Sequence, residues 1–342
     1  MKSVRNIVIL GSTGSIGRST LEVIDKQKDQ FNVVGLAAGG NVALLSEQIR
    51  KYKPEIVALY EHDAVKDLTR ECFVKGVKLC SGVDGVIKVA THRSADFVIS
   101  AIVGAAGLLP TVSAIKEGKD IGLANKEVLV MAGELVIKEA VKKKVAIIPI
   151  DSEHSAIYQS MAGYSPKSIK KVLLTASGGP FRTLEKEDLS GVTVEEALKH
   201  PNWTMGNKIS IDSATMMNKG LEVIEASWLF GVPPDDIEVL IHPQSIVHSM
   251  VEFVDSSVLA QLGLPDMRVP ILYALNYGRR VNLGFESLDL VKAGNLTFEK
   301  PDFDKFPCLR YAYDAINRGG SLPSVLNAAN EVAVQSFLQG ET

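Results

Sequence analysis

Short apolar runs alternate with longer amphipathic stretches through the first 150 residues. Strands are predicted at residues 7–10, 31–37, 56–59, 97–100, 120–124 and 145–150. The stretches between them, beginning with an amphipathic segment at 19–28, have the length of helices that connect parallel strands. The pattern predicts a doubly wound α/β domain over residues 1–150, with helices on both faces of a parallel sheet.

The pattern changes after residue 150. Further strands are predicted at 171–175, 237–240 and 246–253. A long polar stretch at 177–213 is rich in Gly, Pro, Lys and His, and a connection of that length inside a domain usually carries function. Helices are expected at 306–317 and 322–338. We predict a central α/β catalytic domain over 151–276, a linker over 277–302, and a partial, shortened C-terminal helical region over 303–342.

Composition narrows the functional class. The chain of 342 residues is 46% hydrophobic and 23% charged, with a formal net charge of −3, which argues against broad binding to nucleic acid or to an anionic membrane. No apolar run reaches the ~20 residues that a membrane span needs. Cys72, Cys80 and Cys308 are too scattered for a disulfide framework. With no leader sequence before the first strand, a cytoplasmic protein with free thiols is expected.

A glycine-rich turn follows the first predicted strand. The sequence GSTGSIG at 11–17 has the spacing G-x-x-G-x-x-G, and it precedes the first helix. Glycines at such a turn let the backbone approach a pyrophosphate at the helix N-terminus, and the hydroxyls of Thr13 and Ser15 can add hydrogen bonds. The turn predicts a Rossmann-type dinucleotide site, with a purely structural turn as the alternative.

The end of the second strand bears on the choice of dinucleotide. An acidic residue there usually binds the ribose 2′-hydroxyl of NAD. This chain has Ala38, Gly39, Gly40 and Asn41 instead, so the turn tolerates a 2′-phosphate and favours NADP. The turn also has no Arg or Lys that would bind the 2′-phosphate directly.

Two carboxylates follow the strand at 145–150. Asp151 and Glu153 flank Ser152 at the carboxyl end of that strand, where α/β sheets place their sites. Oxygen ligands of this kind suit Mg²⁺ or Mn²⁺. A helix N-cap at Asp151 or Ser152, with Glu153 in the first turn, explains the same residues equally well.

A third group of polar residues lies at 213–222. If this segment is helical, Glu222 shares a face with Asn218 and Lys219 at spacings of four and three. Lys219 can then supply the charge of a phosphate site together with Asn218 and Ser213, and Ser177 offers a further hydroxyl. Glu222 can complete a metal triad. The alternative is a solvated helix face with an ordinary Lys/Glu pair.

Two further segments are candidates for ligand contacts. The loop containing His200, Trp203, Met205 and Gly206 has the features of a lid that closes over a substrate, or of a loop anchored by Trp203. The tripeptide at 125–127 places Lys126 after another strand, where it can face the nicotinamide end of the cofactor and the bound substrate.

Together these motifs resemble one family. The segments are GSTGSIG at 11–17, ANKE at 124–127, DSEH at 151–154, SGGPF at 177–181, HPNWTM at 200–205, SATMMNKGLE at 213–222, HPQSIVH at 242–248 and LNAANEV at 326–332. Over essentially the whole chain they are similar to the 1-deoxy-D-xylulose-5-phosphate reductoisomerase family. The resemblance implies metal- and NADPH-dependent isomerisation, by carbon–carbon cleavage and re-addition, and reduction of 1-deoxy-D-xylulose 5-phosphate to 2-C-methyl-D-erythritol 4-phosphate in non-mevalonate isoprenoid biosynthesis.

The resemblance also implies roles for individual residues. The metal, Mg²⁺ or Mn²⁺ with Co²⁺ as a further candidate, is expected on Asp151, Glu153 and Glu222, which with Lys126 and His200 form the expected catalytic set. The sugar phosphate is expected to contact Ser152, Glu153, Ser177, His200, Ser213, Asn218, Lys219 and Glu222, with Trp203 and Met205 in a flap near 198–208. NADPH is expected to contact Thr13, Gly14, Ser15, Ile16, Gly39, Gly40, Asn41, Asn125, Glu127 and Gly206. A homodimer is expected, without nucleic-acid or membrane partners.

Two other functions remain open from the residues alone. A different NADP-dependent dehydrogenase, acting on a sugar or an amino-acid derivative, would transfer hydride without metal and would not need Glu222. A dinucleotide-binding redox sensor would bind cofactor without turnover, and it would leave the groups at 151–153 and 213–222 unexplained.

Overall fold

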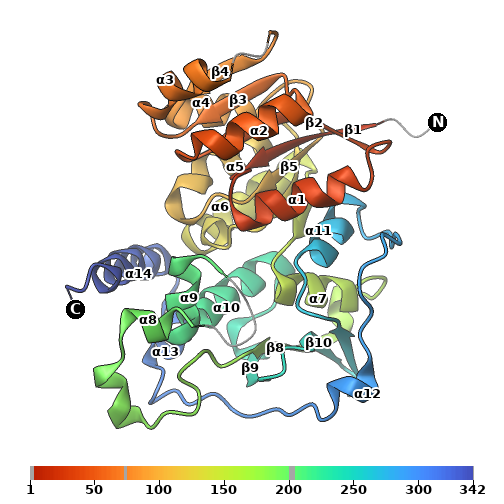
Figure 1. Ribbon diagram of the computed structural model, residues 1–342. Coiled ribbons are helices and arrows are strands. Elements are labelled where there is room, and N and C mark those ends of the chain that lie inside the picture. The colour runs from red at the N-terminus through yellow and green to blue at the C-terminus, as the bar shows by residue number, and fades with distance from the viewer. Residues whose placement is uncertain (1–3, 73–74, 200–204, 342) are drawn as a thin grey trace. The chain divides into compact units, whose positions relative to one another are not determined.

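A computed structural model describes residues 4–72, 75–199 and 205–341 of the chain (Figure 1). The chain forms two compact units, which are described separately. The first unit comprises Met1–Val128, Glu134–Asp151 and Met267–Leu283; the second comprises Leu129–Gly133, Ser152–Asp266 and Gly284–Thr342.

The first unit is built on a seven-stranded sheet in which each neighbouring pair of strands is parallel. Its strands are β1 Arg5–Leu10, β2 Phe31–Ala38, β3 Ile56–Leu59, β4 Lys78–Ser81, β5 Phe97–Ser100, β6 Asp120–Leu123 and β7 Ile147–Pro149. Their order is β4-β3-β2-β1-β5-β6-β7. The order reverses between β1 and β5, so the predicted doubly wound topology is confirmed and its switch point lies at the carboxyl ends of these two strands.

Helices cover both faces of this sheet. They are α1 Ser15–Asp25, α2 Val42–Tyr52, α3 Ala64–Glu71, α4 Gly82–Ala90, α5 Leu108–Lys116, α6 Glu127–Lys143 and α11 Arg268–Leu275. Right-handed crossovers put α1 to α3 on one face and α4 to α6 on the other. In agreement, α2 packs on α3, α4 packs on α5, and α11 packs on α1. Apart from the edge strand β4, the strands are largely buried and apolar, as a sheet covered on both faces requires.

The second unit has a smaller, mixed sheet of order β11-β10-β8-β9. Its strands are β8 Ile169–Ala176, β9 Ile237–Ile241, β10 Val247–Phe253 and β11 Val258–Leu262. Its α-helices are α7 Ser152–Ser160, α8 Val194–Ala197, α9 Asn207–Ala214, α10 Met217–Phe230, α12 Leu290–Ala293, α13 Pro307–Arg318 and α14 Leu322–Leu338. Among the described residues of either unit, none of the helices has the length and apolarity needed to cross a bilayer.

Three details differ from the elements predicted by the sequence. Helix α1 begins at Ser15, directly after the glycine turn, and ends at Asp25, so the predicted segment at 19–28 starts too late. Strands β4 and β11 were not predicted. β4 has the sequence KLCS, which is not an apolar run, and β11 keeps its apolar side chains exposed at the edge of a sheet. The polar stretch at 177–213 contains the helices α8 and α9.

The C-terminal segments divide between the two units. Residues 267–283, which include α11, belong to the first unit. The sequence analysis had placed them in the catalytic domain, up to residue 276, and in the linker after it. Helices α13 and α14 bury Leu309 and Val334 in the core of the second unit. Ala312 of α13 packs in a second cluster with Leu221 and Ile224 of α10. The helical region expected at 303–342 therefore packs directly against α10. The functional domain boundaries at 150, 276 and 302 stay a prediction.

Candidate functional site

The glycine turn after β1 has the shape that a dinucleotide site needs. Gly11 has a φ of +88°, and a Cβ there would lie 2.8 Å from the carbonyl carbon of Ala101, just beyond β5. A Cβ on Gly17 would lie 2.5 Å from the Cα of Ser12. Side chains at these two positions would push β1, β5 and α1 apart, so glycine is required for their close packing.

The N-terminus of α1 faces this turn. Gly14 is the N-cap and makes no side-chain capping bond, and the first turn of the helix has no acidic residue. Gly14 and Ser15 are exposed, while Thr13 and Ile16 are half-buried. The amide groups of the first helical turn favour an anion, which makes the turn suitable for the pyrophosphate predicted for it.

Residues after β6 shape the neighbouring loop. The side-chain amide of Asn125 donates hydrogen bonds to the carbonyl of Gly104, at 3.0 Å, and to that of Ile102. Asn125 thus fixes the loop that follows β5, beside the switch point. Lys126 and Glu127 are both buried at the start of α6.

Lys126 forms an ion pair with Asp151, the last residue of the segment Glu134–Asp151 of the first unit. Its Nζ lies 2.6 Å from Oδ2 of Asp151, and their side chains are 7% and 16% exposed. Strands β6 and β7 are parallel neighbours, so the residues that follow them meet at one edge of the sheet. The structure therefore brings together two of the predicted catalytic residues.

In the second unit, α7 and α10 bring two acidic residues together around a lysine. Lys219 Nζ lies 2.8 Å from Oε1 of Glu153 and also donates to the Glu222 carboxylate. The carboxylates of Glu153 and Glu222 have oxygens within 4.8 Å of each other. Burial opposes the charge on Lys219, but the two carboxylates outweigh it and raise the lysine pKa. Two carboxylates this close need a cation between them, and in this structure it is the ammonium group.

Neighbouring polar groups hold both carboxylates in place. Ser152 Oγ donates to Oε2 of Glu153 at 2.6 Å. Asn218 Nδ2 donates to Oε1 of Glu222 at 2.5 Å, which confirms the helical spacing of four. The sequence predicted Lys219 as a phosphate ligand, whereas here it lies between the two acidic residues.

A buried histidine and a third glutamate lie next to this cluster, on the same two helices. His154 Nε2 is 3.0 Å from the backbone carbonyl of Glu222 and 3.5 Å from Oε2 of Glu225, and the side chains of His154 and Glu225 have no solvent exposure. These contacts join α7 to α10. Glu225 was missed from the sequence, although its spacing of three from Glu222 puts both on one helix face.

His248, on β10, is another buried histidine, and the sequence did not single it out as a site residue. Its Nδ1 lies 3.0 Å from Oε1 of Gln261 on β11. Burial lowers the pKa of His248, despite the opposing effect of Glu153, and this favours the neutral form of the ring. It therefore adds a polar, uncharged group to the surroundings of Glu153.

The serines predicted for phosphate binding also come close together. Gly179 has a φ of +70°, and a Cβ on it would lie 2.5 Å from the carbonyl oxygen of Ser213 in α9. The backbone amide of Gly179 donates to Oγ of Ser177 at 3.2 Å. The loop after β8 thus packs against the end of α9, and glycine is required for this close approach.

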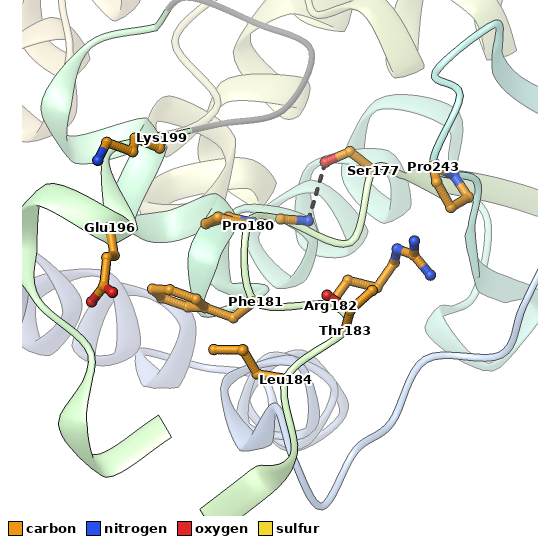
Figure 2. A pocket seen from close by; sticks show the side chains of 10 residues that line it. Ser177, Pro180, Phe181, Arg182, Thr183, Leu184, Glu196, Lys199 and Pro243 are labelled. Carbon is orange, nitrogen blue, oxygen red and sulfur yellow. Dashed lines mark hydrogen bonds between the residues drawn. The ribbon is translucent and has the colours of Figure 1, made fainter. Parts of the chain in front are cut away.

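Ser177 lines a cavity of about 440 Å³ in the second unit (Figure 2). Arg182 and Lys199 supply positive charge to its lining, although Arg182 pairs with Glu299 at 3.2 Å and Lys199 with Glu195 at 2.8 Å. The remaining lining residues are Gly179, Pro180, Phe181, Thr183, Leu184, Glu196 and Pro243. These two side chains are the cationic groups of a lining that is otherwise mostly apolar.

The middle of the predicted flap, residues 200–204, lies outside the described residues. His200 and Trp203 both fall in the interval 200–204, so their predicted roles are not tested. Met205 is half-buried and Gly206 is the N-cap of α9. Their contacts with substrate or cofactor stay a prediction.

Comparison with known proteins gives a consistent result. Sequence models described as 1-deoxy-D-xylulose 5-phosphate reductoisomerase, as its C-terminal domain, and as DXP reductoisomerase C-terminal domain match residues 7–133, 147–230 and 262–342. The 1-deoxy-D-xylulose 5-phosphate reductoisomerase of Pelodictyon phaeoclathratiforme (strain DSM 5477 / BU-1) is 56% identical over 335 residues, which cover 98% of this chain and 88% of the relative.

Solved structures agree with the sequence matches. The enzyme from Zymomonas mobilis in complex with NADPH superimposes with a TM-score of 0.93 at 43% identity, covering 99% of this chain and 88% of that one. A DOX-P reductoisomerase in complex with NADPH, fosmidomycin and magnesium gives a TM-score of 0.95 at 45% identity, covering 98% of this chain and 85% of that one.

Proposed function

Because the chain belongs to the 1-deoxy-D-xylulose 5-phosphate reductoisomerase family, we propose that it converts 1-deoxy-D-xylulose 5-phosphate to 2-C-methyl-D-erythritol 4-phosphate with NADPH and a divalent metal ion. The observation that carries the proposal is the convergence of Glu153 and Glu222 from separate helices on one cation position. A dehydrogenase without metal and a cofactor sensor both leave this close pair of carboxylates without a function.

We propose that Asp151, Glu153 and Glu222 are the metal ligands. Carboxylate oxygens are the ligands that Mg²⁺ and Mn²⁺ prefer, and the Glu153–Glu222 pair already binds a positive charge. Asp151 is only two residues from Glu153, so their Cα atoms lie within about 7 Å whatever the arrangement of the units. When bound, the metal would polarise the ketose carbonyl as a Lewis acid.

The other residues would position the substrate and the cofactor. Ser177, Ser213, Asn218 and Lys219 would bind the phosphate, Ser152 and Lys126 would contact the sugar, and the turn at 11–17 would bind the pyrophosphate of NADPH. Holding the sugar at both its phosphate and its oxygens keeps cleaved fragments in place until they recombine. Binding of a divalent cation to Glu153 and Glu222 would release the Lys219 ammonium for the phosphate.

One assay tests this function. Oxidation of NADPH is followed by absorbance with 1-deoxy-D-xylulose 5-phosphate, with and without Mg²⁺ or Mn²⁺, for the parent chain and for Glu153→Gln. We expect turnover that requires the metal and is lost in the variant. Full activity in the presence of a chelator would disprove the role of the metal.

We also propose that the protein is a cytoplasmic homodimer. The three cysteines are free thiols, as is usual in a reducing compartment. Strand β11 is an edge of its sheet and exposes the apolar side chains of Val258, Leu259 and Leu262. An antiparallel pair of two such edges would bury them about a twofold axis.

Sedimentation can test this interface. Leu259→Lys places a charge on the edge strand and is expected to shift the protein from dimer to monomer. Val291→Lys, at a side chain 92% exposed on α12, is the control and should leave the dimer intact. A Leu259→Lys protein that sediments as a dimer would show that β11 is not the interface.

A further inference from the structure

An acidic side chain from the segment that follows β3 Ile56–Leu59 lies beside the turn after β2. Strand β2 ends at Ala38, and Gly39 and Gly40 lead to Asn41, whose side chain accepts a hydrogen bond from the amide of Leu44 at 3.1 Å. Asn41 therefore caps α2 with its oxygen. The sequence of this turn contains no acidic residue, but the neighbouring strand supplies one.

Glu61 lies against Gly40. The ladder between β2 and β3 continues past both strands, since the amide of Tyr60 donates to Ala38 at 2.8 Å and that of Glu61 donates to Gly39 at 3.3 Å. A Cβ on Gly40 would overlap the Glu61 carboxylate, with Oε1 only 2.6 Å away. The carboxylate thus lies where a side chain of residue 40 would project.

This position matters for the adenosine ribose of a dinucleotide. A carboxylate at the end of the second strand accepts a hydrogen bond from the 2′-hydroxyl of NADH, whereas it repels a 2′-phosphate. We propose that Glu61 determines cofactor specificity, by binding the ribose 2′-hydroxyl of NADH and weakening the binding of NADPH. The preference of the chain for NADPH over NADH is then smaller than a site without this acid would give. The inference rests on the proposed use of NADPH.

Direct binding of nucleotides tests the inference without any turnover. The dissociation constants of NADPH and NADH are measured by fluorescence titration for the full-length parent, for Glu61→Gln, and for Glu47→Gln, which removes the same charge from the exposed face of α2. Glu61→Gln is expected to bind NADPH roughly tenfold more tightly and NADH about threefold more weakly. Glu47→Gln should match the parent.

Ionic strength supplies a second measurement. Salt screens the repulsion between Glu61 and the 2′-phosphate, so the preference of the parent for NADPH over NADH should rise between low and high salt. The preference of Glu61→Gln should change less. If Glu61→Gln and Glu47→Gln have the same preference, Glu61 has no role in specificity, although the proposed function stands. If the parent binds neither nucleotide, the proposed cofactor is wrong as well.

Discussion

Replacement of Lys219 by methionine is expected to destabilise the metal-free protein by about 3 kcal/mol, because it leaves a buried charge without its partner. The lysine side chain is 4% exposed, and its partners Glu153 and Glu222 are 20% and 1% exposed. Without the ammonium group, two carboxylates within 4.8 Å of each other share a low-dielectric site and lose the cation that lies between them. The free energy of unfolding, measured with denaturant in the presence of a chelator, checks the result.

Added Mn²⁺ or Mg²⁺ should restore much of this loss. A ligand at 100 times its dissociation constant stabilises the folded state by about 2.7 kcal/mol, and the variant should gain more than the parent because no ammonium competes with the metal. Lys171→Met is the control, since Lys171 pairs with Glu238 on the surface and its loss should cost at most about 1 kcal/mol. A Lys219→Met protein as stable as the parent without metal would contradict the proposed charge balance.

Replacement of Glu222 by glutamine is expected to lower kcat/KM by about 10³-fold. The substitution keeps the size of the side chain but removes a charged metal ligand, and Lewis-acid stabilisation of several kcal/mol corresponds to about three orders of magnitude in rate. The affinity for Mn²⁺, measured by electron paramagnetic resonance, should fall in parallel. The affinity for NADPH should remain, because the glycine turn that would bind it lies in the other unit.

Glu238→Gln is the matched control for this experiment. It removes the same charge from β9 of the same unit, at a side chain that pairs with Lys171. Its activity and metal affinity should equal those of the parent. If Glu222→Gln also retains both, Glu222 is not a metal ligand.

Apart from β4, the strands of the first unit were predictable because they are short apolar runs separated by stretches of helical length. Fully buried parallel strands such as β1 and β5 are continuous apolar runs, and the glycine turn fixed the place of α1 in the topology. β11 was missed because it lacks the alternation of buried apolar and exposed polar residues that identifies a strand with one buried face; its apolar residues face solvent. The first turn of α1 was missed because Ser15 and Gly17 have low helix propensity and belong to the turn motif.

For the candidate site, the sequence supplied the residue types but not their partners. The spacing of Asn218, Lys219 and Glu222 predicted a shared helix face, and the structure confirms it. The contact between Lys219 and Glu153 joins two helices far apart in the chain, so it depends on tertiary packing that no local pattern encodes. Glu61 was missed for the same reason, because it reaches the turn after β2 from the neighbouring strand.

The most direct test of the metal site is a crystal structure of the protein with Mn²⁺ and NADPH, with the metal located by anomalous scattering. We expect a single strong peak about 2.1 Å from carboxylate oxygens of Asp151, Glu153 and Glu222, with the Lys219 ammonium displaced from between the two glutamates. A peak at other residues, or three carboxylates pointing into separate surroundings with the lysine still between Glu153 and Glu222, would contradict the proposed mechanism.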